Sequence, residues 1–396
     1  MRVAIIGQGY VGLTIAIGAA GAGHEVIGID VNKVLVSQLN SGFSHIEGIS
    51  DSALKSFLST KIYSASTDGS ALNGCDVVVI AVPTPLTESR NPDLTFVHAA
   101  VELIQNNVKS LTLVINESTS YPGTLRKEIA GRITGITHLY ASSPERVDPG
   151  NTKWGTKNTP RLIGGLTPEA VAKAKEFYSS FCDTVIEVSS PEVAEAAKIF
   201  ENTFRQVNIA LVNEFAQIAD ALGISGREVL DAAATKPYGF MEFNPGPGVG
   251  GHCIPVDPTY LAYVANEVGV PATFIKRANE VNLAMPAYVV KRVIAGAGGS
   301  VKGKSLVVVG VSYKANVADT RETPATSIID LLRQAGATVT WHDSLVGSWR
   351  GEESSDLGVS DVAVVVTKHD VVSVADIKKS SYVFDCTGLI AGADGI

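Results

Sequence analysis

The 396-residue sequence has little cysteine, no long apolar run and no excess of basic residues. Its four cysteines lie far apart and form neither a Cys-x-x-Cys pair nor a zinc-like Cys/His spacing, so we expect no disulfide framework and no metal site. A net charge of −8 argues against a general polyanion binder. Gln8, His24 and Glu25 interrupt the apolar N-terminal stretch, which excludes a signal peptide or a membrane span there. We therefore expect a reduced, cytoplasmic protein.

The N-terminal residues have the pattern of a dinucleotide-binding unit. A β-branched run at 2–6 leads to Gly-Gln-Gly-Tyr-Val-Gly at 7–12, a helix rich in alanine and glycine, and a second strand that ends at Asp30. Glycines at this spacing allow a tight turn, the approach of a pyrophosphate and close helix–strand packing, while the helix N-terminus attracts the anion. Asp30 would accept a hydrogen bond from a ribose hydroxyl and repel a 2′-phosphate, which predicts NAD rather than NADP. The alternative for Asp30 is an ordinary turn residue.

The rest of the chain predicts further domains. Ser190-Pro191 is typical of a helix start, and the helical pattern runs from there to Leu222. A second helical stretch is expected at about 258–295, and the last hundred residues repeat the strand pattern of the first hundred. The prediction is an α/β protein with two Rossmann-like doubly wound domains, joined by a long central helix and a helical middle domain. We place the NAD-binding domain at 1–189, the central helical domain at 190–298 and the C-terminal domain at 299–396.

Lys198 and Asn202 lie four residues apart on the predicted long helix and therefore share a face. A cation and an amide on a mostly apolar surface need partners, and one interpretation is that the pair stabilises a developing oxyanion. The alternative is a structural salt bridge from Lys198 to Glu195 or Glu201.

Cys253 follows a glycine-rich loop and precedes a carboxylate, Asp257, by four residues. It is a candidate nucleophile, although a lone cysteine is more often a small buried hydrophobe. The latter interpretation applies to Cys75, Cys182 and Cys386, which lie in or beside apolar strand-like runs. His252 is a candidate acid–base group, with a metal ligand as the alternative, and Glu145 is either catalytic or merely solvated.

Taken in order, these motifs resemble the UDP-sugar 6-dehydrogenase family, which includes the UDP-glucose, UDP-N-acetylglucosamine and UDP-N-acetylmannosamine dehydrogenases. The likeness spans nearly the whole chain. It covers the glycine fingerprint, Val-Pro-Thr-Pro-Leu at 82–86, Glu-Ser-Thr at 117–119, Ser-Pro-Glu-Arg at 143–146, Glu-Ala-Ala-Lys at 195–198 with Asn202, the loop ending in His252-Cys253, and Tyr313-Lys314 followed by Asp-Thr-Arg-Glu at 319–322. Residues 91–94 and 243–255 look most like the N-acetylhexosamine branch, with UDP-N-acetylglucosamine as the nearest match.

The resemblance implies a four-electron oxidation of the sugar C6 hydroxyl to the uronic acid, with two NAD consumed and a thiohemiacetal and a thioester formed on Cys253. Catalytic roles would fall to Cys253, Lys198, Asn202, Asp257, Glu145 and Thr119. The implied cofactor-binding residues are Gly7, Gly9, Tyr10, Val11, Gly12, Asp30, Lys33, Thr84, Thr119 and Arg321. The implied substrate-binding residues are Glu145, Arg146, Lys198, Asn202, Phe243, Gly250 and Lys314. The family further implies that the C-terminal domain binds the UDP-sugar and that the central helix pairs two subunits into a homodimer.

Some positions depart from the family pattern. Ser344 follows Asp343 where the family often has proline, and Asp-Cys-Thr-Gly at 385–388 replaces a more common sequence. These departures bear on the nucleotide and the sugar more than on the chemistry. UDP-glucose or UDP-N-acetylmannosamine remains an alternative substrate. The motifs also leave open a two-electron β-hydroxyacid-type dehydrogenase and a non-catalytic protein that binds NAD or a UDP-sugar.

Overall fold

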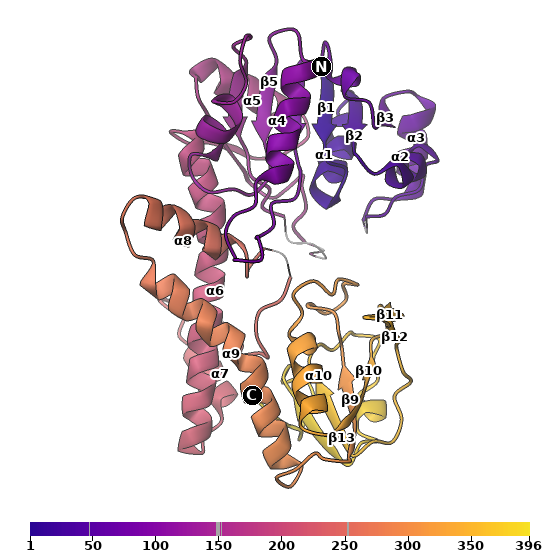
Figure 1. The fold of residues 1–396 in the computed structure, drawn as a ribbon, viewed down its shortest axis with the longest axis vertical. Coiled ribbons are helices and arrows are strands. Elements are labelled where there is room, and N and C mark those ends of the chain that lie inside the picture. Colours follow the sequence, from indigo (N-terminus) through magenta and orange to yellow (C-terminus); the bar gives the residue numbers. More distant parts are fainter. Residues whose placement is uncertain (47, 148–150, 152, 252) are drawn as a thin grey trace. The chain divides into compact units, whose positions relative to one another are not determined.

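The computed structural model describes residues 1–46, 48–147, 151, 153–251 and 253–396. The candidate residue His252 lies outside the described residues. The chain divides into two compact units, each with its own core (Figure 1). The first unit comprises Met1–Glu201 and Tyr263–Val270, and the second comprises Asn202–Ala262 and Pro271–Ile396.

An eight-stranded sheet forms the centre of the first unit, in the order β3-β2-β1-β4-β5-β6-β7-β8. Neighbouring strands run parallel except for the antiparallel pair β6 and β7. The bounds are β1 (Arg2–Ile6), β2 (Glu25–Ile29), β3 (Tyr63–Ser66), β4 (Val77–Ile80), β5 (Leu113–Asn116), β6 (Leu139–Ser142), β7 (Arg161–Gly165) and β8 (Val185–Glu187). The order reverses between β1 and β4, and in sheets of this kind ligands bind at the carboxyl ends of the strands beside that point.

Helices complete the first unit, and α1 packs against β1, β2 and β3. The helices are α1 (Tyr10–Gly21), α2 (Lys33–Asn40), α3 (Asp51–Ser59), α4 (Thr95–Asn107) and α5 (Pro168–Ser179), with the short 3-10 helix η1 (Gly69–Leu72) and the short π-helix η2 (Leu125–Ala130). The central strands β4 and β5 are fully buried and almost entirely apolar, because a parallel sheet is covered on both faces.

The long helix α6 runs from Pro191 to Leu222 and begins where the sequence predicted. The hydroxyl of Ser190 accepts a hydrogen bond from the Val193 amide at 3.3 Å, so it caps the first turn. The predicted second helical stretch is wrong as a single element, because it is divided into α8 (Asp257–Glu267) and α9 (Thr273–Gly296). Gly269, at φ +76°, and Pro271 lie at the break, and neither fits a continuous helix. The short helix α7 (Gly226–Ala234) follows α6.

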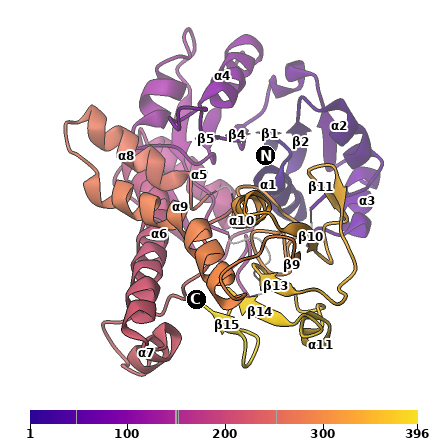
Figure 2. The same cartoon turned by 60° about the horizontal axis from the view of Figure 1, so that its bottom comes forward.

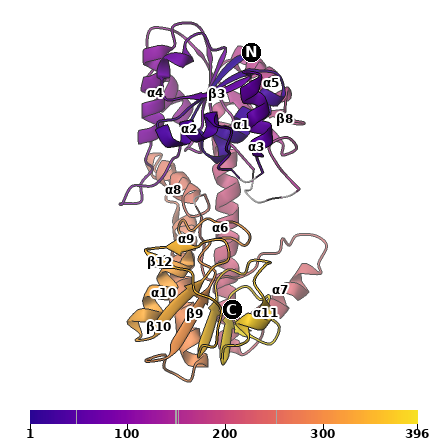
Figure 3. The ribbon, with the colours of Figure 1, turned by 90° about the vertical axis from the view of Figure 1, so that its right-hand side faces the viewer.

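A second parallel sheet forms the core of the C-terminal part, in the order β10-β9-β13-β14-β15 (Figure 2). Its strands are β9 (Ser305–Val309), β10 (Thr338–His342), β13 (Val362–Val365), β14 (Tyr382–Asp385) and β15 (Asp394–Gly395), beside the small hairpin β11 (Ser348–Trp349) and β12 (Glu352–Glu353). The helices α10 (Pro324–Gln334) and α11 (Val374–Ile377) flank this sheet (Figure 3). Alternate residues of β9 point to opposite faces, so Leu306 and Val308 pack with α10 while Val307 and Val309 pack with Ile377 of α11.

The α/β fold with two Rossmann-like sheets and a helical region between them in sequence is therefore confirmed. Among the described residues, no helix is both long enough and apolar enough to cross a membrane.

Candidate functional site

The glycine fingerprint adopts the backbone geometry that a dinucleotide site requires. Gly7 has φ +92°, and a Cβ there would lie 2.3 Å from the carbonyl oxygen of Ala81. A Cβ on Gly12 would lie 1.8 Å from the carbonyl oxygen of Gly7, so only glycine lets α1 pack this close to the sheet. Gly9 differs, because a Cβ there would meet no described atom within 4 Å. The open backbone at Gly9, at the N-terminus of α1, fits the pyrophosphate of NAD.

Asp30 connects this turn to the end of β2. Its carboxylate accepts hydrogen bonds from the backbone amide of Gln8 at 2.8 Å and from that of Asn32 at 2.9 Å. The first bond holds the fingerprint loop, and the second is the turn role that the alternative interpretation proposed. Each carboxylate oxygen has more than one acceptor site, so Asp30 keeps the capacity to bind a ribose hydroxyl.

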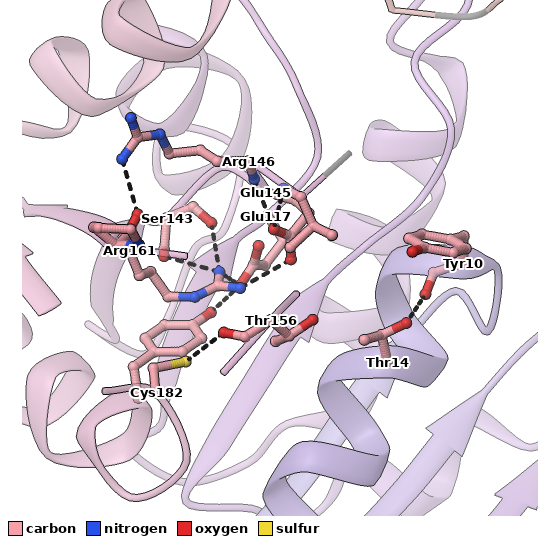
Figure 4. Close-up of polar contacts among 12 residues, drawn as sticks. Tyr10, Thr14, Glu117, Ser143, Glu145, Arg146, Thr156, Arg161 and Cys182 are labelled. Atoms are coloured by element: carbon pink, nitrogen blue, oxygen red, sulfur yellow. Dashed lines mark hydrogen bonds and ion pairs between the residues drawn. The ribbon is translucent and has the colours of Figure 1, made fainter. Parts of the chain in front are cut away.

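The other predicted cofactor residues of the first unit lie near strand ends and helix starts. Tyr10 and Val11 begin α1, where the Thr14 hydroxyl donates to the Tyr10 carbonyl at 2.6 Å (Figure 4). Lys33 is exposed at the start of α2. The hydroxyl of Ser118 exchanges hydrogen bonds with the backbone of Val82, at 2.9 and 2.8 Å. These bonds join the loops after β4 and β5, which carry the predicted residues Thr84 and Thr119.

Glu145 is held in a buried polar cluster that the sequence did not predict. The guanidinium of Arg161, the first residue of β7, donates to Glu145 at 2.9 Å and also pairs with Glu117 (Figure 4). Burial by itself disfavours ionised Glu145, but Arg161 and the amides of residues 146 and 147 outweigh it and lower the pKa of this carboxyl. The only sequence signal was an arginine at the start of an otherwise apolar strand.

Arg146, a predicted substrate residue, is engaged within the protein. Its guanidinium pairs with Glu201 of α6 at 2.6 Å and donates to the Pro160 carbonyl at 2.8 Å. The side chain is only partly buried, so these contacts leave its role in substrate binding a prediction.

The structural alternative for Lys198 can be assessed directly. Glu195 is buried and accepts hydrogen bonds from the backbone amides of Gly123 and Leu125, at 2.7 and 2.8 Å. Glu201 pairs with Arg146. Neither carboxylate therefore forms an ion pair with Lys198, which is 9% exposed and has no salt bridge among the described residues. A buried cation of this kind, one helical turn before Asn202, fits an oxyanion-binding role.

The second unit positions Asn202, Asp257 and Cys253. The amide of Asn202 donates to the carboxylate of Asp257, the first residue of α8. The carbonyl of Cys253 accepts from the amide of Asp257 at 2.8 Å, so the cysteine lies one turn before α8. Cys253 is the exposed cysteine of the four, whereas Cys75, Cys182 and Cys386 are buried. This contrast is what a nucleophile and three packing residues would show.

The glycine loop before Cys253 lies against the segment 313–322. A Cβ on Gly250 would lie 2.7 Å from the Cβ of Tyr313, and the amide of Gly251 donates to the carbonyl of Arg321 at 2.9 Å. Arg321 forms a two-pronged ion pair with Asp319. That bond is the main reason that the pKa of Arg321 is raised, and the charge of Cys253 adds to it. The charge of Arg321, a predicted cofactor residue, therefore interacts with that of the candidate nucleophile Cys253.

Phe243 and Lys314, both predicted substrate residues, lie elsewhere in the second unit. Phe243 packs edge-on against Phe204 of α6, with ring centroids 5.9 Å apart. Lys314 is half-buried in the loop after β9. That loop begins with Gly310, at φ +87°, where a Cβ would lie 2.0 Å from the Thr367 carbonyl oxygen.

This loop repeats the geometry of the first fingerprint. Gly310 donates to the carbonyl of the last residue of β10, as Gly7 does to that of β2, both at 2.8 Å. Asp343 accepts from the amide of Val311 at 2.9 Å, as Asp30 accepts from that of Gln8. The second sheet therefore keeps the same loop geometry at its switch point without the three-glycine motif, and ligands bind at such points in sheets of this kind.

The fold and these features define a nucleotide-binding dehydrogenase. Comparison with known proteins gives the family. The chain matches the UDP-glucose/GDP-mannose dehydrogenase family over its NAD binding domain at residues 1–182, its central domain at 192–284 and its UDP binding domain at 307–391. The chain belongs to this family and is an NAD-dependent UDP-sugar dehydrogenase.

Individual relatives share most of the length. A UDP-N-acetyl-D-mannosamine dehydrogenase of Methanococcus maripaludis is 36% identical over 390 residues, covering 96% of this chain and 88% of the relative. A UDP-N-acetyl-D-glucosamine 6-dehydrogenase of Pseudomonas aeruginosa is 34% identical over 345 residues, covering 84% and 80%. The solved structure of the UDP-D-ManNAc dehydrogenase of Pyrococcus horikoshii superposes with a TM-score of 0.89 at 31% identity, covering 100% and 99% of the two chains.

Proposed function

We propose that this protein oxidises the C6 hydroxyl of a UDP-N-acetylhexosamine to the uronic acid in two successive two-electron steps on one active site. The observation that carries the proposal is the state of Cys253, which is exposed while the other three cysteines are buried. A two-electron β-hydroxyacid dehydrogenase would use Lys198 and Asn202 but has no need of a cysteine or of a second Rossmann-like sheet.

In the first step the C6 hydroxyl loses a proton and a hydride and becomes an aldehyde. Bound NAD supplies the hydride acceptor in this step and in the second oxidation. Lys198 and Asn202 stabilise the negative charge that develops on the C6 oxygen. Asp257 holds the Asn202 amide through the hydrogen bond described above, so that the remaining N–H of Asn202 is available to the substrate.

In the second half-reaction the thiolate of Cys253 adds to the aldehyde carbon and forms a thiohemiacetal. Loss of a second hydride gives a thioester, and attack by water releases the uronic acid and restores the thiol. Glu145 and Asp257 handle the protons and orient the water, and Thr119 assists them. Per sugar, the balance is two NAD reduced and one water consumed.

The relatives favour the N-acetylmannosamine epimer as the sugar, because named UDP-N-acetylmannosamine dehydrogenases match at 36% identity. The sequence motifs favoured UDP-N-acetylglucosamine, and the Pseudomonas aeruginosa relative keeps that epimer as the second candidate. UDP-glucose is the third. The residues proposed to hold the UDP-sugar are Glu145, Arg146, Lys198, Asn202, Phe243, Gly250 and Lys314.

We also propose a homodimer that forms through α6. Leu211, Ile218 and Leu222 are large apolar residues exposed at helical spacing on this helix, as an interface would require. We also propose a reducing, cytoplasmic compartment, because the cysteines are few and lie far apart in the sequence.

A substrate panel tests the proposed function. UDP-N-acetylmannosamine, UDP-N-acetylglucosamine, UDP-N-acetylgalactosamine and UDP-glucose are each incubated with NAD, and NADH formation is followed. We expect the highest kcat/KM on an N-acetylhexosamine with a 6-hydroxyl. Turnover of UDP-glucose alone would contradict the branch assignment, and binding without turnover of any UDP-sugar would contradict the enzymatic proposal.

A further inference from the structure

Two carboxylates, Glu117 and Glu145, share one buried guanidinium in the first unit (Figure 4). The Arg161 side chain is 4% exposed, and it pairs with Glu117, just after β5, and with Glu145, just after β6. Tyr178 of α5 donates its hydroxyl to the same Glu117 oxygen and presents its ring to Arg161, 4.5 Å from the guanidinium carbon. Two negative groups and one positive group are therefore enclosed together, away from water.

The two carboxylates differ in how many of their oxygens accept a hydrogen bond. One oxygen of Glu145 accepts from the amides of Arg146 and Val147, at 2.6 and 2.8 Å, and the other accepts from Arg161. Glu117 uses one oxygen for both Arg161 and Tyr178, while its other oxygen is buried and has no hydrogen-bond partner among the described residues. A buried anionic oxygen without a partner is costly, and protonation lowers that cost because a neutral carboxyl is less unfavourable to bury than a charged one.

Of the two carboxyls, Glu117 is therefore the one that the surroundings favour for protonation. Burial raises the pKa of Glu117 to about 7, with Glu145 adding to the rise and Arg161 and Tyr178 opposing it. The pKa of Glu145 is lowered, as described above. Burial also raises the pKa of Tyr178 and of the nearby Cys182 thiol, so both stay neutral near pH 7. Arg161 stays charged, because the two carboxylates outweigh the effect of its burial on its pKa.

We propose that Arg161 is the positioning residue of Glu145. Glu117 is the second counter-ion of Arg161, and by gaining or losing a proton it changes the strength of the attraction between Arg161 and Glu145. This inference rests on the proposed role of Glu145 in proton transfer. With Glu117 protonated, the charge of Arg161 is balanced by Glu145 alone, which keeps Glu145 a weak base. With Glu117 ionised, Arg161 is shared and the added negative charge makes Glu145 a stronger base.

The test is the pH profile of kcat/KM for the UDP-sugar, measured on the full-length protein. Wild type should show a step centred near pH 7. Glu117→Gln should lack that step, because the amide cannot ionise. Tyr178→Phe removes a hydrogen bond that favours ionised Glu117, so the step should move to higher pH. A Glu117→Gln profile that coincides with that of wild type, or a Tyr178→Phe step that moves to lower pH, would overturn the proposal.

Arg161→Lys tests the positioning role. A lysine keeps the charge but cannot bond both carboxylates with the planar geometry of a guanidinium. We expect kcat to fall about tenfold or more while KM for the UDP-sugar changes by less than about threefold, the pattern of a lost interaction in the transition state. A change in KM alone would contradict the positioning role. Thermal unfolding of each variant shows whether it is folded. If Glu117→Gln or Arg161→Lys does not fold, the direction in which Tyr178→Phe moves the pH step still tests the proposal.

A spectroscopic measurement separates this inference from the proposed function. Infrared spectra of the protein without substrate, taken as wild type minus Glu117→Gln, should show a protonated carboxyl band that is lost as pH rises through about 7. The subtraction removes the band of Glu195, a second buried carboxyl, because burial raises the pKa of Glu195 to about 8. If no UDP-sugar is turned over but this band titrates, the proposed function fails while the buried proton on Glu117 stands. If a UDP-sugar is turned over but the band is missing, the proposed function stands and the buried proton on Glu117 is ruled out.

Discussion

The side-chain amide of Asn202, on the long helix α6, donates a hydrogen bond to the carboxylate of Asp257, the first residue of α8. The two residues are 55 positions apart in the sequence, and the bond fixes the orientation of an amide that can donate only two hydrogens. One donor is committed to Asp257, and the proposed function assigns the second to the substrate oxygen.

Replacing this amide by a carboxylate of nearly the same size should therefore lower the catalytic rate strongly. Asn202→Asp sets two carboxylates against each other and removes the donor, and we expect kcat to fall about 10²- to 10³-fold. Steady-state kinetics on the preferred UDP-sugar measure this. Asn208→Asp is the matched control on the same helix, because the Asn208 amide contacts only the carbonyl of Phe204 among the bonds described. Equal losses in both variants would contradict the account.

The four cysteines should differ in reactivity as they differ in burial. Iodoacetamide should alkylate Cys253 and leave the other three, because these are buried and burial raises the pKa of each of their thiols. Intact-mass spectrometry of the folded protein should show one adduct per chain, and Cys253→Ser should show none. Prompt labelling of a second site in folded wild type would count against the assignment of the nucleophile.

Arg321 should favour the thiolate form of Cys253. The charges of the two groups interact, and the carboxylate of Asp319 partly neutralises Arg321. Removing the cation in Arg321→Gln should slow alkylation of Cys253 at neutral pH by roughly three- to tenfold. Removing the neutralising carboxylate in Asp319→Asn should speed it. The rates are measured without cofactor, so that any loss of NAD binding has no effect. Slower alkylation in both variants would point to a disturbed loop rather than to electrostatics.

The second sheet should be sensitive to acid through Asp343. Burial disfavours its ionisation, but the bond from His369 at 3.0 Å and those from Leu345 and Ser312 outweigh burial, so its pKa lies well below the usual 3.8. A lowered pKa in the folded state stabilises the fold above the usual value, and that stability is lost as pH falls below it. Asp343→Asn should lose about 1–3 kcal/mol of stability at neutral pH and show less dependence on acid.

Urea unfolding followed by tryptophan fluorescence measures this effect, because one of the three tryptophans, Trp341, is buried two residues before Asp343. Asp330→Asn is a suitable control, because Asp330 lies at the surface in an ion pair with Arg350. If wild type and Asp343→Asn lose stability in parallel as pH falls, the assignment of the acid sensitivity to Asp343 is wrong.

Much of the fold could be predicted from local patterns. The strands at 2–6 and 25–29 and the start of α6 at Pro191 follow from short stretches whose glycines, β-branched residues and cap are visible in the sequence. Such features depend on neighbours within a few residues. The break between α8 and α9 was missed, although Gly269 and Pro271 mark it, because the apolar pattern continues on both sides.

The contacts that organise the candidate site could not be predicted in this way. Glu117 and Arg161 are 44 residues apart in the sequence. The antiparallel pairing of β6 with β7 brings Arg161 within hydrogen-bond distance of Glu117 and Glu145. No local pattern indicated that Glu201 would pair with Arg146, which removed it as a partner for Lys198. These pairings depend on strand order, which local patterns do not determine.

The most direct test of the central claim is the number of NADH molecules formed per sugar oxidised. UDP-N-acetylmannosamine and UDP-N-acetylglucosamine, at limiting concentration with excess NAD, are taken to completion with wild type and with Cys253→Ser. The account predicts two NADH per sugar and a uronic acid product from wild type, and a marked loss of acid formation in the variant. One NADH per sugar from wild type, or undiminished acid formation by Cys253→Ser, would contradict it.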